Sequence, residues 1–282
     1  MPTVISGRDG EVRFGPGLPT VIIGERINPT GRKKLAARLA QGDLDVVGEE
    51  ALSQKRAGAE ILDVNVGTGA GREEAQLPEA VQKALEATGL PICIDSASAV
   101  AMRAALKVYP HKPLVNSVTG EEESLETILP LVREHRAAVI AMPVDKNGLS
   151  KSVSSRVEIA RRIVDRAASH GIAPEDVVID CMAMAASTDA AAVGVTLEVI
   201  RVVTRDLRLS TTMGVSNISF GMPERHTITS AFLAMAIEAG LSAAIIDPTV
   251  PGMVYTVLSS NFLCGRDEYA GRYLSYYRAS RQ

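Results

Sequence analysis

Short apolar runs alternate along the chain with longer segments that have helical periodicity. The runs are rich in valine, isoleucine and alanine, as buried parallel strands usually are. They predict strands at 21–24, 60–64, 91–95, 113–116, 138–142, 177–180, 211–216 and 243–247. Helical spacing between the strands is clearest at 43–57, 121–136, 188–207 and 227–239. Eight strands that alternate with helices predict an α/β fold of one domain, the (β/α)8 TIM barrel.

The helical segments carry recognisable ends. Gly58 ends the first segment, and three glutamates at 121–123 suit the positive end of a helix dipole. Thr188 and Asp189 are good capping residues and predict the start of the third helix. The segment 227–239 is apolar on nearly all sides, which is typical of a helix buried under a neighbour or a second subunit. We therefore expect a homodimer.

Two pieces lie outside the repeat. Residues 1–19 form an N-terminal unit in which 3–14 predict a hairpin that turns at Gly7–Gly10 and covers the amino-terminal end of the barrel. Residues 20–265 form the barrel. Residues 266–282 are rich in tyrosine and arginine and predict a C-terminal helical extension, amphipathic or part of an interface.

Composition excludes several classes of protein. The 282 residues suit a single barrel, with 46% apolar and 22% charged residues. A net charge of −3, 4% aromatic residues and no tryptophan argue against nucleic acid as a partner. No apolar run approaches the roughly 18 residues that span a bilayer, and the first residues lack the apolar centre of a signal peptide. We expect a soluble, cytoplasmic protein.

The cysteines Cys93, Cys181 and Cys264 are scattered and form no CxxC pair. This pattern argues against a disulfide framework and a structural zinc site. We expect no metal bound by this chain.

Polar residues end several of the predicted strands. Asp95, Asn116, Asp180 and Asn217 stand at the ends of four of them. One such residue is ordinarily a turn former, but four of them indicate a site at the carboxyl face of the barrel. Acids and amides suit a flat heterocycle that is rich in hydrogen-bond donors. Further polar residues at strand ends, which serve as caps or as part of the site, are Glu25, Asp63, Asn65, Ser96 and Ser216.

These residues lie in motifs that resemble a known family. The motifs are GERINPTG at 24–31, LDVNVG at 62–67, IDS at 94–96, VNS at 115–117, ID at 179–180 and GVSN at 214–217. They resemble the pterin-binding, corrinoid-dependent methyltransferases. That family includes methyltetrahydrofolate:corrinoid/iron–sulfur protein methyltransferase, the folate module of cobalamin-dependent methionine synthase and the tetrahydrofolate methyltransferases of demethylation systems. The resemblance covers about residues 20 to 250.

The resemblance implies methyl transfer between tetrahydrofolate or 5-methyltetrahydrofolate and the cobalt of a corrinoid. Asp95, Asn116 and Asp180 match the positions that hold the pterin edge. Asn217, next to Ser216, matches the asparagine that reaches the methyl-bearing nitrogen, with water or an acid such as Asp180 as the source of the proton. Arg225 matches a family arginine, which contacts the folate tail or caps the next helix. Either direction of transfer uses the same site, so the direction stays open.

The corrinoid is expected on a separate protein that docks transiently over the barrel mouth. None of His111, His135, His170 and His226 has an aspartate two residues before it, as the DxHxxG corrinoid motif requires. A dihydropteroate synthase is a second interpretation, but it needs a diphosphate-binding loop and an Arg-x-His strand end where this chain has GERINPTG and IIDP. A third interpretation is a folate-binding or corrinoid-docking subunit without activity. The loss of Asn217 or of the acids would distinguish such a subunit.

Overall fold

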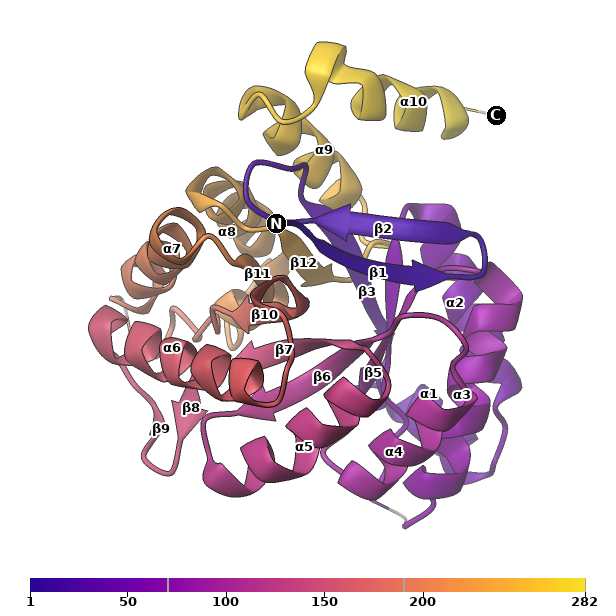
Figure 1. Cartoon of the computed structure of the whole chain (residues 1–282). Helices are drawn as coiled ribbons and strands as arrows, with labels where there is room; N and C mark the ends of the chain where they lie inside the picture. The colour runs from indigo at the N-terminus through magenta and orange to yellow at the C-terminus, as the bar shows by residue number, and fades with distance from the viewer. Residues whose placement is uncertain (70, 190, 282) are drawn as a thin grey trace.

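The computed structural model describes residues 1–69, 71–189 and 191–281, and its centre is a closed barrel of eight parallel strands (Figure 1). The strands, in chain order, are β3 (Val21–Ile27), β4 (Ile61–Val64), β5 (Ile92–Asp95), β6 (Leu114–Thr119), β7 (Ala138–Met142), β10 (Val177–Asp180), β11 (Ser210–Gly214) and β12 (Ala243–Ile246). β12 pairs with β3 and closes the ring. The predicted (β/α)8 barrel is confirmed.

Helices form the outer layer of the barrel. They are α1 (Lys33–Ala40), α2 (Asp45–Ala57), α3 (Glu73–Thr88), α4 (Ala99–Val108), α5 (Glu122–Glu134), α6 (Val153–Ser169), α7 (Ala192–Val202), α8 (Arg225–Ala239) and α9 (Met253–Leu263). α2 ends as predicted at Gly58, whose φ of 111° is a left-handed conformation that suits glycine. None of the helices in the described parts of the chain combines the length and the apolar character needed to cross a membrane.

The predicted start of the third helical segment is wrong. α7 begins at Ala192, and the Asp189 carboxylate accepts a hydrogen bond from the Ala191 N–H at 3.0 Å. Asp189 therefore stabilises a turn before the helix instead of opening it, because an aspartate side chain competes readily for nearby backbone N–H groups. A short π-helix, Val203–Leu207, extends α7 at its other end.

The apolar helix α8 packs against α7 and α9. It buries Phe232, Leu233, Ala236 and Ile237, whereas Met235 is 47% exposed. The chain's own core thus covers much of the apolar surface of α8, and one side of the helix stays open to solvent.

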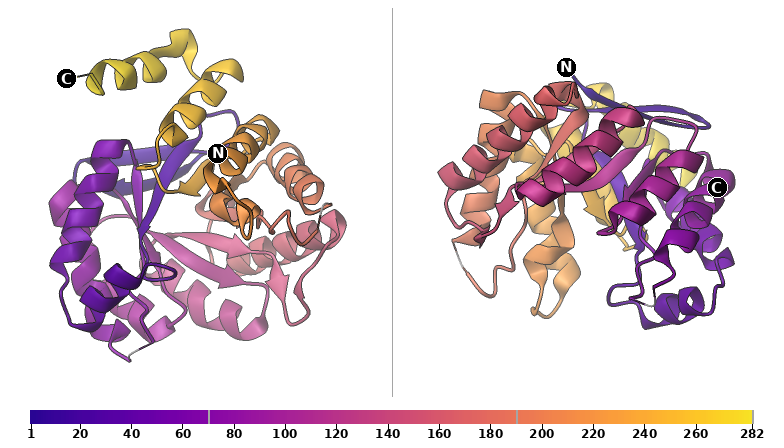
Figure 2. Two further views of the ribbon diagram at one scale, coloured as in Figure 1. Left: turned by 180° about the vertical axis from the view of Figure 1, so that it is seen from behind. Right: turned by 60° about the horizontal axis from the view of Figure 1, so that its bottom comes forward.

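The N-terminal hairpin seals one end of the barrel. β1 (Thr3–Gly7) pairs with β2 (Gly10–Phe14), and Gly7 lies opposite Gly10 as predicted. Ile5 and Phe14 are fully buried and pack with the residues that fill the barrel interior. Figure 2 (right) shows the hairpin at the end opposite the long loops that follow the strands. Truncating a phenylalanine buried in this way costs about 3–5 kcal/mol, so the hairpin belongs to the core.

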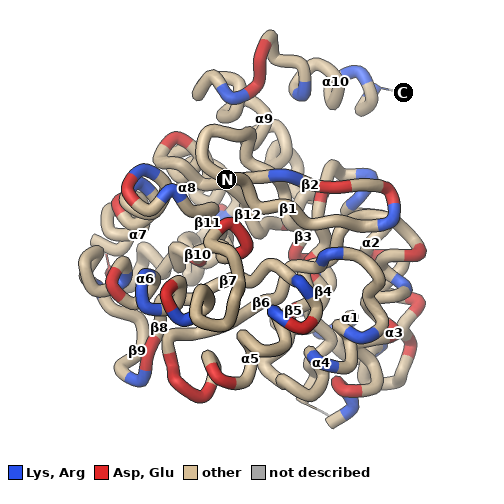
Figure 3. The backbone as a smooth tube through the Cα atoms, in the orientation of Figure 1, with Lys and Arg blue, Asp and Glu red and all other residues tan. Residues whose placement is uncertain are grey.

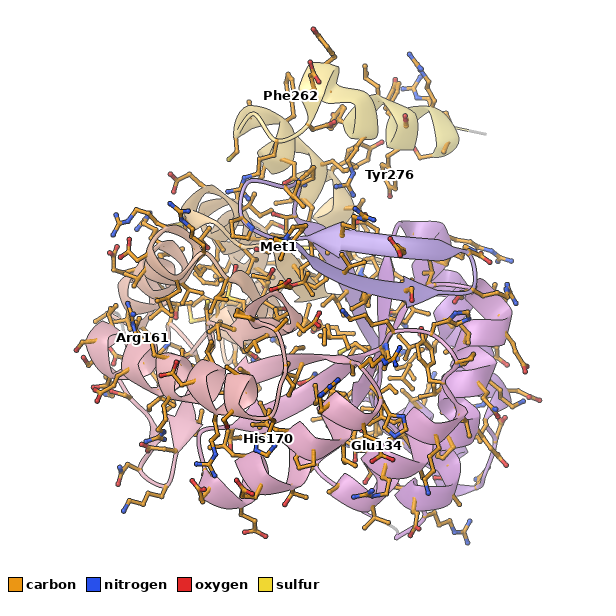
Figure 4. All side chains as sticks on the ribbon, in the orientation of Figure 1. Met1, Glu134, Arg161, His170, Phe262 and Tyr276 are labelled. Carbon is orange, nitrogen blue, oxygen red and sulfur yellow. The ribbon has the colours of Figure 1, made fainter. Side chains whose placement is uncertain are left out.

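The chain ends in η4 (Glu268–Ala270) and α10 (Gly271–Ala279), which lie beyond α9 and stand away from the barrel (Figure 1). Tyr276 faces the barrel in Figure 4, and its hydroxyl donates to the Ala57 carbonyl at 3.1 Å. Leu263 is 81% exposed. This helical extension is as predicted, while the domain boundaries at 19/20 and 265/266 stay predictions.

One element was not predicted. A small hairpin of β8 (Val144–Asp145) and β9 (Gly148–Leu149) follows β7. On the outer helices, basic and acidic residues are interspersed over the face drawn in Figure 3. Arg166, for example, pairs with both Glu122 and Glu126. Mixed charge of this kind fits the small net charge of the chain.

Candidate functional site

The period of the strands explains why acids face the interior of the barrel. Ile61, Cys93, Leu114 and Val178 belong to the apolar cluster inside it. Side chains two positions apart on a strand point to the same side. The next inward positions are Asp63, Asp95, Asn116 and Asp180. A polar layer therefore lies directly above an apolar floor, at the carboxyl ends of the strands.

Asp95 and Asn116 lie side by side, since they are register partners on β5 and β6. Asn116 Nδ2 donates to Asp63 Oδ1 at 3.2 Å, and Asn65 Nδ2 donates to Asp95 Oδ2 at 3.0 Å. Asn65 Oδ1 in turn accepts from the Gly67 N–H at 2.8 Å. These four predicted residues form two hydrogen-bonded pairs, which the register of Asp95 and Asn116 places side by side, and we call them the strand-end cluster. The hydrogen bonds that Asn65 and Asn116 donate fix the orientation of both side-chain amides.

The strand-end cluster favours protonated carboxyl groups. Burial raises the pKa of Asp95 to about 6, and the hydrogen bond from Asn65 opposes this rise. Asp63 is only 3% exposed, and burial together with the nearby Asp95 charge raises its pKa well above the ordinary value. N–H donors of a ligand stabilise the ionised form of a carboxyl group, so a ligand that donates to these acids offsets the cost of burying their charge.

A cavity of about 540 Å³ opens beside this cluster. Asp95 and Asn116 line it, with Ser96, Ser117 and Thr119. Its volume lies in the range of small-molecule sites, roughly 300–1,000 Å³. Ser96 is buried, and its hydroxyl bonds the Glu73 carboxylate and the Ser98 N–H. The Ser96 hydroxyl is therefore already hydrogen-bonded within the turn. Asp95 and Asn116 are the residues of the strand-end cluster that face the cavity.

A second cavity of about 330 Å³ opens at β3, β11 and β12. Glu25, Ser216, Arg225, His226 and Asp247 are among the residues that line it. Burial first, and then the Asp247 charge, raise the pKa of Glu25 to about 7, while Ser216 and Arg225 oppose the rise. Of the predicted site residues, Asp95, Ser96 and Asn116 line the first cavity, and Glu25, Ser216 and Arg225 line the second. The structure does not place Asp63, Asn65, Asp180 or Asn217 in the lining of either one.

Asp180 lies at the end of β10 and accepts a hydrogen bond from the Met182 N–H at 2.8 Å. Burial raises its pKa to about 6, and that N–H and the Arg156 guanidinium oppose the rise. Asp180 is thus a half-buried acid whose pKa lies near neutral pH, which is the range in which an acid exchanges protons efficiently.

Asn217 does not end a strand, and the prediction that it does is wrong. β11 stops at Gly214, and Asn217 lies exposed in the 3-10 turn η3 (Val215–Ser219). The Ser216 carbonyl accepts from Ser219 Oγ at 3.1 Å and from Arg225 Nη2 at 2.9 Å. These bonds satisfy the backbone within a turn, so the chain leaves the sheet. Arg225 is itself exposed, and its guanidinium lies 5.7 Å from the centre of the Phe220 ring.

The sequence interpretation missed several residues that shape this mouth. Arg26 donates to Glu50 at 2.7 Å and to Asp247 at 2.8 Å, which ties the loop after β3 to α2 and β12. Asp247 ends the last predicted strand, but the sequence interpretation did not assign it to the site. The sequence also marks Arg156 as unusual, because this charged residue falls on the apolar stripe of α6 with Ala160, Ile163 and Ala167.

A metal site is a separate question. Across residues 1–69, 71–189 and 191–281, the structure groups no three His, Cys, Asp or Glu side chains in a way that would hold an ion.

Comparisons with known proteins agree with this geometry. The family model described as pterin binding enzyme matches residues 24–247. A methylcorrinoid:tetrahydrofolate methyltransferase of Eubacterium limosum is 30% identical over 266 residues, which are 92% of this chain and 96% of that protein. A methionine synthase of Mycobacterium leprae (strain TN) is 31% identical over 83% of this chain and 21% of its own length.

Solved structures share the fold at lower identity. The dihydropteroate synthase of Thermus thermophilus, in complex with 6HMPPP, gives a TM-score of 0.67 at 19% identity, covering 92% of this chain and 99% of its own. That of Coxiella burnetii, in complex with pteroic acid, gives 0.66 at 15% identity, covering 93% and 99%. These likenesses establish the barrel but do not distinguish the reaction. From the family model and the full-length relative, we conclude that this chain belongs to the pterin-binding enzyme family, as one of its methyltransferases.

Proposed function

We propose that this enzyme transfers a methyl group between tetrahydrofolate and the cobalt of a corrinoid carried by a separate protein. The observation that carries the proposal is the pairing of Asp95 and Asn116 in register on adjacent strands, above the buried Asp63. The similarity to a methylcorrinoid:tetrahydrofolate methyltransferase along nearly the whole chain supports the same reaction.

The strand-end cluster suits the edge of a pterin ring. That edge presents a 2-amino-4-oxo pyrimidine with adjacent N–H groups. An ionised Asp95 accepts two such hydrogens in a charge-assisted pair, and the Asn116 amide offers both a donor and an acceptor. Binding then draws Asp95 toward its ionised form, which its burial otherwise disfavours. Asp180 is the third residue we assign to the ring.

Asn217 and Asp180 are the residues we assign to the chemistry. In the direction from methyltetrahydrofolate, the bond between the methyl carbon and the pterin nitrogen breaks, and the electron pair of Co(I) forms the new carbon–cobalt bond. The nitrogen keeps the electron pair of the broken bond and takes up one proton, so that it leaves as a neutral amine. The Asn217 amide stabilises the protonated nitrogen as its charge develops, which accelerates the step. Asp180, with its pKa near 6, supplies the proton directly or through water.

The remaining predicted residues surround these groups. Glu25, Ser216 and Arg225 line the second cavity. We assign Ser216, next to Asn217, to the pterin, and we assign Glu25 and Arg225 to the support of the turn that carries Asn217. The corrinoid protein docks over this mouth, because both cavities open there. The direction of transfer depends on which methylated partner is supplied, since one site serves both directions.

A dihydropteroate synthase activity is less well supported. The loop after β3 has its arginine, Arg26, engaged by Glu50 and Asp247, so that side chain is already committed to ion pairs. β12 leads into Asp247 and Pro248 in place of the Arg-x-His ending of that enzyme. A binding subunit without activity is disfavoured by the presence of Asn217, Asp95 and Asp180.

Two measurements test the proposal. Titration calorimetry of the purified protein should give a tetrahydrofolate dissociation constant in the micromolar range. A spectral assay should then follow the conversion of Co(I) cobalamin to methylcobalamin with 5-methyltetrahydrofolate, or the reverse reaction with tetrahydrofolate. Absence of folate binding would refute the assignment of the cluster, and a corrinoid that copurifies with the chain would refute the separate carrier.

We further propose a cytoplasmic homodimer. The open side of α8, with Met235 exposed, supports a subunit contact there. Sedimentation of the wild type and of Met235→Asp at micromolar concentration tests it. We expect a dimer for the wild type and a larger monomer fraction for the variant. A wild type that sediments only as a monomer would exclude the dimer.

A further inference from the structure

Among the residues that the structure describes, Arg156 on α6 is the largest fully buried side chain, and no carboxylate accepts its hydrogen bonds. Its Nε donates to the Ser150 carbonyl at 2.7 Å. Its Nη1 donates to the Cys181 and Met182 carbonyls, each at 3.2 Å. Burying a guanidinium without a paired acid costs folding free energy. The position of Arg156 therefore needs a reason other than general stability.

The contacts of Arg156 lead to Asp180 through one peptide group. The peptide between Cys181 and Met182 presents its carbonyl to Arg156 and its N–H to Asp180 Oδ1, at 2.8 Å for the latter. Because a peptide is planar, fixing the carbonyl also fixes the direction of the N–H. Arg156 thus orients the donor that holds the Asp180 carboxylate.

The same loop continues to the segment that carries Asn217. The Ala186 N–H donates to the Ile218 carbonyl at 3.0 Å, and Ser187 Oγ donates to the Phe220 carbonyl at 2.8 Å. Met182 holds a φ of 53°, a left-handed value that costs a non-glycine residue roughly 1 kcal/mol or more. The hydrogen bonds of Arg156 on both sides of Met182 hold this conformation in place.

We infer that Arg156 is a positioning residue for methyl transfer: through the loop 181–187, it fixes Asp180 against the pterin and sets the place of the Asn217 turn. This inference rests on the proposed function, since it gives Asp180 and Asn217 their roles. A purely structural arginine would stabilise the fold without a specific effect on folate or on transfer.

A double-mutant cycle separates the two roles. Tetrahydrofolate affinity is measured by calorimetry for the wild type, Arg156→Gln, Asp180→Asn and the double variant. We expect Arg156→Gln to weaken binding about tenfold in the wild type and less than about twofold when Asp180 is already replaced. Equal losses in both backgrounds would overturn the inference. In single-turnover transfer at saturating folate, Arg156→Gln should also lower the rate in the wild type, and much less in Asn217→Ala.

Asn261→Ala is the matched control for lost stability. Asn261 is fully buried at the other end of the barrel, where its side chain bonds the Thr20 N–H at 2.8 Å and the Thr20 carbonyl at 3.0 Å. This variant should lower the melting temperature and leave folate affinity unchanged. If its affinity falls as far as that of Arg156→Gln, the effect of Arg156 is general destabilisation and the inference fails.

A milder variant serves if Arg156→Gln does not fold. Thr196 Oγ1 also donates to the Met182 carbonyl, at 3.2 Å, so Thr196→Val loosens the same loop while the arginine remains. Its loss of affinity should be about twofold to fivefold and should vanish in Asp180→Asn. A wild type that binds no folate refutes the proposed function itself, whereas a binding wild type with additive losses refutes only the role of Arg156.

Discussion

The two sides of the barrel mouth hold their polar residues in different ways. On one side, Asp95 and Asn116 lie within paired strands, and Asn65 and Asp63 fix them by hydrogen bonds. On the other side, Asn217 lies exposed in a 3-10 turn. Hydrogen bonds from Arg225 and from the neighbouring loop hold this turn in place. The first arrangement suits recognition of a rigid ring. The second suits a group whose contact must change as charge develops during the reaction.

The largest effect should come from Asn217→Ala. If the turn serves the chemistry, the single-turnover rate of methyl transfer at saturating folate should fall roughly a hundredfold, as when one donor to a transition state is removed. Folate affinity should fall much less. The assay follows methylcobalamin formation from Co(I) cobalamin and 5-methyltetrahydrofolate. Equal rates for the variant and the wild type would remove Asn217 from the mechanism and leave Asp180 and Asp63 as candidates.

The strand-held side should respond in the opposite way. Asp95→Ala or Asn116→Ala leaves pterin groups without partners at a cost of roughly 1–3 kcal/mol each, which is about a tenfold to hundredfold loss of folate affinity. The transfer rate at saturating folate should change little. Calorimetry and the single-turnover assay together give this contrast. A variant of Asp95 with unchanged affinity would contradict the assignment of the pterin edge.

Glu25 belongs to a strand but faces Ser216 of the turn, so it tests how the two sides are coupled. Because folding raises the pKa of Glu25 from 4.5 to about 7, the folded state favours the protonated carboxyl. Its contribution to stability is fully present below pH 4.5 and is lost as the pH rises through 7. Glu25→Gln cannot ionise and should exceed the wild type in unfolding free energy by roughly 1–3 kcal/mol at pH 8. Denaturant melts at pH 5 and pH 8 measure this gain, which should be much smaller at the lower pH.

The smallest effect should come from Arg225→Lys. The lysine keeps the charge but cannot donate to both Ser219 Oγ and the Ser216 carbonyl in the same geometry. We expect the transfer rate to fall about threefold to tenfold, in line with roughly 1 kcal/mol for a lost hydrogen bond, while folate affinity stays within about twofold. A loss of affinity with an unchanged rate would instead place Arg225 on the folate tail.

The difference between the two sides also decides what the sequence could predict. Asp95 and Asn116 were predictable because the period of two along a strand continues from the apolar floor to the polar layer. Asn217 was assigned to a strand end because nothing in GVSN marks the change from strand to turn. Hydrogen bonds from Ser219 and from the distant Arg225 make that change. Local patterns do not encode such contacts.

Other misses have the same origin. The strands of the β8–β9 hairpin have two residues each, which is too short to leave a periodic pattern. Arg156 lies on the apolar stripe of α6, but its acceptors are backbone carbonyls, and those have no trace in the sequence. The barrel itself was predictable because eight apolar runs repeat with helices between them.

The sealed floor of the barrel has a consequence for kinetics. Ile5 and Phe14 of the hairpin fill the amino-terminal end, so folate enters and leaves at the end where the corrinoid protein docks. Under the proposed function, both substrates reach the site from the same end of the barrel. Folate binds deeper than the corrinoid protein and must therefore enter first. Binding is then compulsory in order, with folate ahead of the corrinoid protein and the folate product released only after that protein departs. Excess corrinoid protein should therefore slow turnover by trapping the folate product behind it.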